Sequence, residues 1–166
     1  MAGCQWPVAS SQLPDVIVVA FGANIGDRHA QIVHAAQRVA ELLSGFRLSS
    51  IIETAPVGAG LEHDPPYLNA VGVGESDLAV RELFVRLRAI EEAAGRTRPY
   101  PGAPRTLDLD LILAGNAVVN EEDLRVPHPR FRERRFVLGP LVELEPDLRD
   151  PATGRTMREL LARLTD

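Results

Sequence analysis

Two aspartates separated by one residue are the clearest indication of chemistry in this sequence. Asp108 and Asp110 lie within an alternating run of Leu and Ile over residues 107–113. Such alternation is typical of a β-strand, on which residues i and i+2 point to the same side, about 7 Å apart. Two carboxylates in this position repel one another, and Mg²⁺ would relieve the repulsion, because it binds one or two carboxylates together with water and phosphate oxygens. The alternative is a strand whose solvent face simply alternates charge.

Arginines flank this pair on both sides. All 18 basic residues are arginine, so a P-loop lysine and a Schiff-base lysine are both excluded. Arg96, Arg98 and Arg105 precede the aspartates in a segment rich in Gly and Pro. The second cluster consists of Arg130, Arg132, Arg134 and Arg135. Guanidinium groups match phosphate oxygens in a bidentate manner, so these residues are candidates for phosphate binding, with ordinary solvated charges as the alternative.

A histidine, two aromatic residues and an asparagine could bind a phosphate group or a planar heterocycle. His128 lies between Pro127 and Pro129, where it could donate to a phosphate oxygen or be purely structural. Tyr67 and Phe136 could stack on a planar heterocycle, and Asn69 could form paired hydrogen bonds with it. Core packing is the alternative for both aromatic residues.

Hydrophobic spacing predicts the elements that would position these residues. We expect strands over residues 15–21, 46–54, 67–73 and 107–113, a helix from the Asp27 cap to residue 43, a helix from the Asp77 cap to Gly95, and a short strand over 116–119. The order strand, helix, strand, strand, helix, strand predicts an α+β fold. Its core would be a ferredoxin-like βαββαβ unit, an antiparallel sheet with both helices on one face.

The C-terminal part contains the remaining predicted elements. We expect a short arginine-rich helix or turn over residues 128–135, an apolar segment over 136–144 and a helix over 156–164. These C-terminal additions would cover the second face of the sheet and complete an α/β/α sandwich. Residues 1–14 show no sustained period, so we expect a flexible N-terminal extension, followed by a single domain over residues 15–166.

Composition limits the classes of partner. The net charge of −5 argues against a general nucleic-acid surface, which needs clustered positive charge. The longest uncharged apolar stretch, residues 16–23, is too short to cross a membrane, and no secretion signal is recognised. Cys4 is the only cysteine, so neither an internal disulfide nor a cysteine-based metal site can form. We therefore expect a cytoplasmic protein that binds neither nucleic acid nor membrane.

Several segments, taken together, resemble the 6-hydroxymethyl-7,8-dihydropterin pyrophosphokinase (HPPK) family. The most specific stretch is Pro-Arg-Thr-Leu-Asp-Leu-Asp over residues 104–110, which is similar to the family's signature around its two metal-binding aspartates. The supporting stretches cover residues 21–27, 53–58, 67–70, 95–98, 126–129 and 135–138. The likeness extends from about residue 16 to residue 146, nearly the whole predicted domain.

The resemblance implies an activity and a set of residue roles. The family transfers diphosphate from ATP to 6-hydroxymethyl-7,8-dihydropterin and releases AMP, a step of folate biosynthesis that uses two Mg²⁺ ions. The implied roles are metal binding for Asp108 and Asp110, catalysis for Arg96 and Arg105, ATP binding for Arg98, His128 and Arg134, and pterin binding for Thr54, Val57, Tyr67, Asn69 and Phe136. We expect a monomer, and contact with a neighbouring folate-pathway enzyme stays open.

The sequence departs from the family pattern at Ala23, which replaces a usual serine, at Pro129, where some members have tyrosine, and in one loop. Pro101 and Gly102 stand where the family commonly has a basic residue and a tryptophan. One alternative reading is therefore a catalytically silent module that binds nucleotide or pterin. An RNA-binding ferredoxin-like domain is a second alternative, which the acidic net charge and the lack of clustered exposed aromatics on the predicted strands disfavour.

Overall fold

The computed structural model describes residues 15–56, 58, 60–95 and 106–164. The elements in chain order are β1 (Asp15–Ala23), α1 (Arg28–Ala40), β2 (Ser44–Leu48), β3 (Ile52–Thr54), β4 (Tyr67–Ser76), α2 (Val80–Ala93), β5 (Asp108–Ala114), β6 (Val119–Asn120), β7 (Arg125–Val126), the 3₁₀ helix η1 (Phe131–Glu133), α3 (Arg135–Leu144) and α4 (Met157–Ala162). The fold is mixed α and β, as predicted. The expected N-terminal extension over residues 1–14 lies outside the described residues.

The main sheet is antiparallel and has the strand order β2-β4-β1-β5, with β3 also paired to β4. The long strands β1 and β4 form its centre, and β5 lies at one edge. A separate two-stranded sheet joins β6 and β7. Among the described strands, β1 is therefore the one partner of the strand that carries both aspartates.

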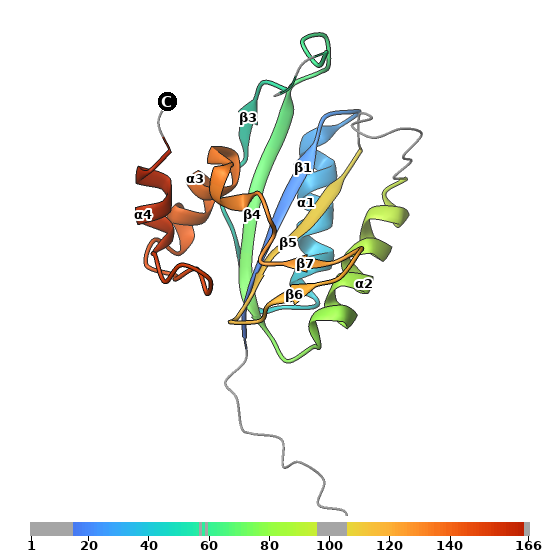
Figure 1. The fold of residues 1–166 in the computed structure, drawn as a ribbon. Helices are drawn as coiled ribbons and strands as arrows, with labels where there is room; N and C mark the ends of the chain where they lie inside the picture. The colour runs from blue at the N-terminus through green and yellow to red at the C-terminus, as the bar shows by residue number, and fades with distance from the viewer. Residues whose placement is uncertain (1–14, 57, 59, 96–105, 165–166) are drawn as a thin grey trace, which may run out of the picture.

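Each face of the sheet is covered by a different group of helices. Along β1, alternate residues belong to different hydrophobic clusters, because successive side chains of a strand point to opposite faces. Val19 packs in the cluster that contains buried residues of α1 and α2, whereas Val18 packs with buried residues of α3 and α4. In Figure 1, α3 and α4 lie together on one side of β4, away from α1 and α2.

The two predicted helix caps differ in outcome. Asp27 caps α1 as predicted, since the backbone N–H of Ala30 donates to its Oδ1 at 3.0 Å. The predicted Asp77 cap is wrong. Strand β4 continues to Ser76, so Asp77 lies in the connecting turn, and α2 begins at Val80 with Ala79 as a cap that makes no side-chain hydrogen bond.

The single strand predicted over residues 46–54 is two strands. Ser49 lies between β2 and β3, and its hydroxyl accepts a hydrogen bond from the backbone N–H of Val71 in β4 at 2.9 Å. The N–H of Ser49 donates to the carbonyl of Val71. A side-chain oxygen thus replaces a backbone acceptor at this point, which interrupts the regular ladder while the chain stays beside β4.

The C-terminal predictions agree with η1, α3 and α4. The arginine-rich turn is η1, the apolar segment is helical as α3, and the last helix is α4. Thr156 and Glu159 form a capping box at the start of α4. Across the described part of the chain, no helix is both long and apolar enough to cross a membrane.

Candidate active site

Asp108 and Asp110 face the same side of β5. Their side chains are partly exposed, whereas Leu109 between them is buried. The last turns of α2 hold this part of the strand. The buried carboxylate of Glu91 accepts a hydrogen bond from the backbone N–H of Leu109 at 2.7 Å, and the hydroxyl of Thr106 donates to the carbonyl of Ala94 at 3.0 Å. These two contacts hold the strand on the side away from β1.

The register of the sheet brings Asp108 close to Asn69. Gly22 of β1 pairs with Asn69 of β4 on one side and with Asp108 of β5 on the other. Ala20 of β1 pairs with Asp110 in the same way. Because adjacent strands lie about 4.8 Å apart, Asn69 and Asp108 are two strand spacings apart with only a glycine between them. The small side chains of β1 therefore leave the surface between β4 and β5 open.

The residues expected to bind a heterocycle come from β3, β4 and α3. Thr54 and Tyr67 are cross-strand partners, and the Nδ2 of Asn69 donates to the Oγ1 of Thr54 at 2.7 Å. Phe136 lies in the first turn of α3 and packs with the α3 and α4 cluster that covers one face of the main sheet. These residues line a cavity of about 560 Å³, into which both aspartates also open. One cavity thus combines acidic, amide and aromatic side chains.

Basic groups border the aspartates. The Nη1 of Arg134 lies 3.6 Å from Asp110 Oδ2, and the Arg134 guanidinium is 5.6 Å from the centre of the Phe136 ring. The Nε2 of His128 lies 3.9 Å from the same carboxylate oxygen. Burial lowers the pKa of His128 to about 4, aided by the charges of Arg134 and Arg130 and opposed by Asp108. His128 is therefore neutral at pH 7 and retains one N–H donor.

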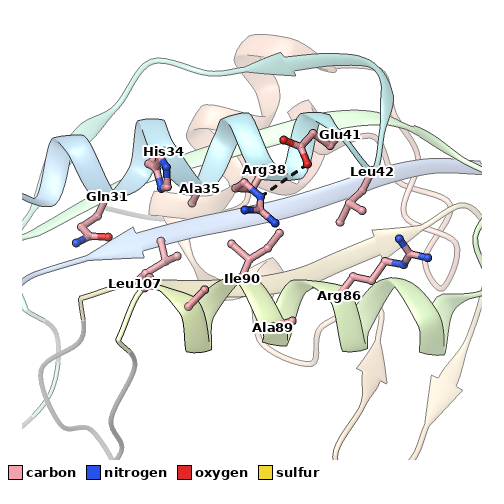
Figure 2. A pocket seen from close by; sticks show the side chains of 12 residues that line it. Gln31, His34, Ala35, Arg38, Glu41, Leu42, Arg86, Ala89, Ile90 and Leu107 are labelled. Carbon is pink, nitrogen blue, oxygen red and sulfur yellow. Dashed lines mark ion pairs between the residues drawn. The ribbon is translucent and has the colours of Figure 1, made fainter.

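A second cavity of about 280 Å³ lies between α1 and α2 (Figure 2). Its floor is apolar and includes Ala35 and Ile90, and Arg38 on its border lies 3.7 Å from Glu41. Among the described residues predicted to act on a substrate, none lines it. The described residues that were predicted to act on a substrate lie in or beside the larger cavity instead.

Comparison with known proteins assigns the chain to a family. The family model for 7,8-dihydro-6-hydroxymethylpterin-pyrophosphokinase (HPPK) matches residues 18–146. The chain belongs to the HPPK family. The HPPK resemblance drawn from separate sequence segments is thereby confirmed.

Bacterial relatives match the HPPK chain over most of their length. The 2-amino-4-hydroxy-6-hydroxymethyldihydropteridine pyrophosphokinase of Pseudomonas aeruginosa is 40% identical over 149 residues, which is 88% of this chain and 90% of that protein. The Bacillus subtilis protein of the same name is 37% identical over 142 residues, 84% of each. A longer relative is the Folic acid synthesis protein fol1 of Pneumocystis carinii, 30% identical over 153 residues. The match covers 92% of this chain but spans only 20% of that protein.

Solved structures support the fold of this HPPK family member. The wild-type HPPK-DHPS of Plasmodium falciparum matches with a TM-score of 0.70 at 13% identity, covering 93% of this chain and 45% of that chain. A structure of its A437G/K540E variant with pterin and p-hydroxybenzoate matches with a TM-score of 0.69 at 12% identity, covering 93% and 44%. At such identities the likeness concerns the fold alone.

Most of the residues with implied HPPK roles lie together. Those that line the larger cavity are Thr54, Tyr67, Asn69, Asp108, Asp110, Arg134 and Phe136. His128 contacts Asp110 at its border. Four residues with implied roles lie outside the described part of the chain, namely Val57, Arg96, Arg98 and Arg105.

The cavity also contains residues to which sequence reasoning gave no HPPK role. Arg130 and Arg135 line it, and membership of the arginine cluster was the only signal for them. Glu133 and Leu61 line it as well, with no signal in the sequence that could have selected them. Gly22 could have been selected, because a glycine inside a strand indicates close approach of a neighbouring group.

Proposed function

We propose that the chain transfers diphosphate from ATP to 6-hydroxymethyl-7,8-dihydropterin in the larger cavity, with the residue roles given below. The activity is that of its family, a 2-amino-4-hydroxy-6-hydroxymethyldihydropteridine diphosphokinase of folate biosynthesis. The main support for this site is that Asp108 and Asp110 line the same cavity as Tyr67, Asn69 and Phe136. A metal-phosphate site and a heterocycle site can thus adjoin one another, as a transfer between two substrates requires.

The pterin would occupy the part of the cavity between β3, β4 and α3. Tyr67 and Phe136 offer aromatic faces for stacking on the ring, and the amide of Asn69 offers both a donor and an acceptor. The hydrogen bond from Asn69 to Thr54 fixes the orientation of that amide. We assign Val57 to the same site from the family resemblance.

The two aspartates fit a Mg²⁺ site by their donor chemistry. Mg²⁺ keeps several waters and binds one or two carboxylates together with substrate phosphates, so a pair of carboxylates is a sufficient protein contribution. Within the described ranges, no group of three or more His, Cys, Asp and Glu side chains is arranged to hold a metal. We propose that Asp108 and Asp110 hold two Mg²⁺ ions with ATP. When bound, Mg²⁺ would neutralise charge on the phosphates.

The basic residues would hold the triphosphate. The guanidinium of Arg134 borders Asp110 and can bind phosphate oxygens in a bidentate manner, and the neutral His128 can donate one N–H to a phosphate oxygen. We propose that Arg98 joins them in binding ATP and that Arg96 and Arg105 stabilise the charge that spreads over the transferring group.

The transfer is a displacement at phosphorus. The hydroxymethyl oxygen forms a bond to the β-phosphorus, the bond from that phosphorus to the α–β bridging oxygen breaks, and AMP leaves with the bridging oxygen. The hydroxyl proton is released. We assign no general base, because phosphoryl transfer depends chiefly on positioning and on charge stabilisation.

We also assign the core to the ferredoxin-like βαββαβ class. The strand order β2-β4-β1-β5 and the packing of α1 and α2 into one cluster support this assignment. The packing of α3 and α4 against the other face supports an α/β/α sandwich. A cytoplasmic location, a monomeric state and contact with other folate-pathway enzymes stay predictions.

Product analysis tests the proposed reaction. The protein is incubated with ATP, Mg²⁺ and 6-hydroxymethyl-7,8-dihydropterin, and nucleotides are separated by chromatography. We expect AMP in equal amount to the pterin diphosphate, and no AMP when the pterin is left out. Formation of ADP would contradict the β-phosphorus attack, and binding of both substrates without AMP would favour the silent binding module.

A further inference from the structure

Arg28 joins the first turn of α1 to both ends of the segment over residues 55–66. Its Nη1 donates to the carbonyl oxygen of Pro66 at 2.6 Å, and its Nη2 lies 3.0 Å from Glu53 Oε2. Glu53 belongs to β3, which precedes the segment, and Pro66 immediately precedes β4. One guanidinium group thus contacts the chain on either side of the segment.

These contacts lie next to the proposed pterin site. Thr54 follows Glu53 and Tyr67 follows Pro66, so each contact of Arg28 is one residue away from a cavity-lining residue. Leu61, within the segment itself, also lines the cavity. The contacts of Arg28 therefore help to set the position of one wall of the proposed pterin site.

The contacts are suited to ordering the segment rather than to stabilising the whole fold. The side chains of Arg28 and Glu53 are 28% and 56% exposed, and such a solvent-exposed ion pair contributes little to global stability. The bond to Pro66 is charge-assisted, and the planar guanidinium offers two acceptors a fixed relative position. The Asp27 cap fixes the helix start from which Arg28 projects.

We propose that Arg28 is a positioning residue that holds Glu53 and Pro66, and with them the adjoining Thr54 and Tyr67, in place and so raises the affinity for pterin. This inference rests on the proposed function of the larger cavity. A segment held in its binding position before the substrate arrives loses less conformational freedom on binding. We assign Arg28 no direct contact with either substrate, since it does not line the cavity.

The test compares variants of Arg28 by steady-state AMP formation and by direct binding of the fluorescent pterin. For Arg28→Gln we expect the pterin KM and Kd to rise by about threefold to tenfold, the effect of ordering one or two more groups on binding. The ATP KM and kcat should stay within about twofold of the wild type. Arg28→Lys should recover part of the affinity, because lysine keeps the charge but not the planar fork.

Two control variants separate the proposed role from general disturbance. Arg38→Gln removes an arginine from the same helix, where Arg38 is 56% exposed and pairs with Glu41, and it should leave the pterin KM unchanged. Glu53→Gln should have a smaller effect than Arg28→Gln, since the contact with Pro66 remains.

An unchanged pterin Kd in Arg28→Gln would overturn the inference, as would an equal change in Arg38→Gln. A fall in kcat with both KM values unchanged would also overturn it. Absence of AMP from the wild-type protein would instead contradict the proposed function. Pterin binding would then still test Arg28, because it needs no turnover.

Discussion

The side chain of Asn69 extends from strand β4 into the cavity that contains the proposed pterin site. It is only 7% exposed, and its Nδ2 donates to Thr54 Oγ1. Its neighbour across the β1–β4 pair is Gly22, whose missing side chain leaves the Asn69 amide accessible from the cavity. The oriented amide can therefore recognise a heterocycle by hydrogen bonds that an apolar wall could not supply.

Replacing Asn69 should weaken pterin binding selectively. For Asn69→Ala we expect the pterin Kd to rise by about 5-fold to 150-fold, because a buried polar partner left without its hydrogen bonds costs about 1–3 kcal/mol. The Kd for ATP should change little, since Asn69 is assigned to the pterin alone. Fluorescence titration with pterin and calorimetry with ATP measure the two constants. Asn120→Ala, at an exposed position of β6, is the matched control, and a loss confined to ATP binding would refute the assignment.

Among the secondary-structure elements, helix α2 supports strand β5, which carries both aspartates. In the described part of the chain, β5 is an edge strand, so on one side its backbone groups face no paired strand. The carboxylate of Glu91, 1% exposed, satisfies the N–H of Leu109 between the two aspartates. The helix therefore replaces a missing strand at the point where the carboxylates must be held.

Loss of the Glu91 carboxylate should destabilise the fold. For Glu91→Leu we expect the free energy of unfolding to fall by about 1–3 kcal/mol, because the buried N–H of Leu109 loses its acceptor. Glu92→Leu, at the next and exposed position of α2, should change stability by no more than about 0.5 kcal/mol. Urea unfolding followed by circular dichroism measures both values. Equal stabilities of the two variants would show that the hydrogen bond to Leu109 contributes nothing.

Sequence patterns predicted those elements whose evidence is local. Alternation around Asp108 and helical spacing after Asp27 report directly which side of an element is buried, so β5 and α1 were predicted near their observed positions. The break at Ser49 was not predicted, because it depends on a hydrogen bond with Val71 in another strand. Asp77 was wrongly expected as a cap, since local sequence does not show how far β4 stays paired.

The candidate site likewise contains residues that a local pattern or family resemblance indicated and residues that depend on contacts between distant parts of the chain. The i, i+2 spacing of Asp108 and Asp110 predicted that both carboxylates lie on one side of the strand. Residue type suggested Tyr67, Asn69 and Phe136 as heterocycle ligands, whereas Thr54 and Val57 were added by the family resemblance alone. The contact of Arg28 with Pro66 joins residues 38 positions apart, and no local pattern could predict it. The chain positions that sequence reasoning missed are those defined by tertiary contacts.

At the scale of the whole molecule, the C-terminal layer closes the site and is itself held by a buried ion pair. Arg132 in η1 donates to Asp150 through Nε at 2.6 Å and Nη2 at 2.7 Å, and the Asp150 side chain is 0% exposed. Burial alone would raise the pKa of Asp150. The hydrogen bonds from Arg132, Thr153 and the Ala152 N–H outweigh burial, so its pKa is lowered.

The lowered pKa gives this ion pair a defined pH dependence. The stabilisation is fully present above the ordinary aspartate pKa of 3.8 and is lost as the pH falls through the lower value of the folded state. At pH 7, Asp150→Asn should lower the free energy of unfolding by about 1.5–3 kcal/mol, the usual contribution of hydrogen bonds to a charged group. The difference from the wild type should shrink in urea unfolding below about pH 3.8. A difference that stays constant down to pH 2 would contradict the ionised pair.

The proposed reaction depends above all on the carboxylates of Asp108 and Asp110, which line the same cavity as the proposed pterin ligands. The most direct test is AMP formation by Asp108→Asn and Asp110→Asn, which keep the side-chain shape and remove the charge. We expect kcat/KM to fall by at least about 100-fold, because metal ions supply several kcal/mol of charge stabilisation in such transfers. Pterin binding measured without nucleotide should be retained. Turnover at the wild-type rate in either variant would contradict the proposed role of that carboxylate in diphosphate transfer.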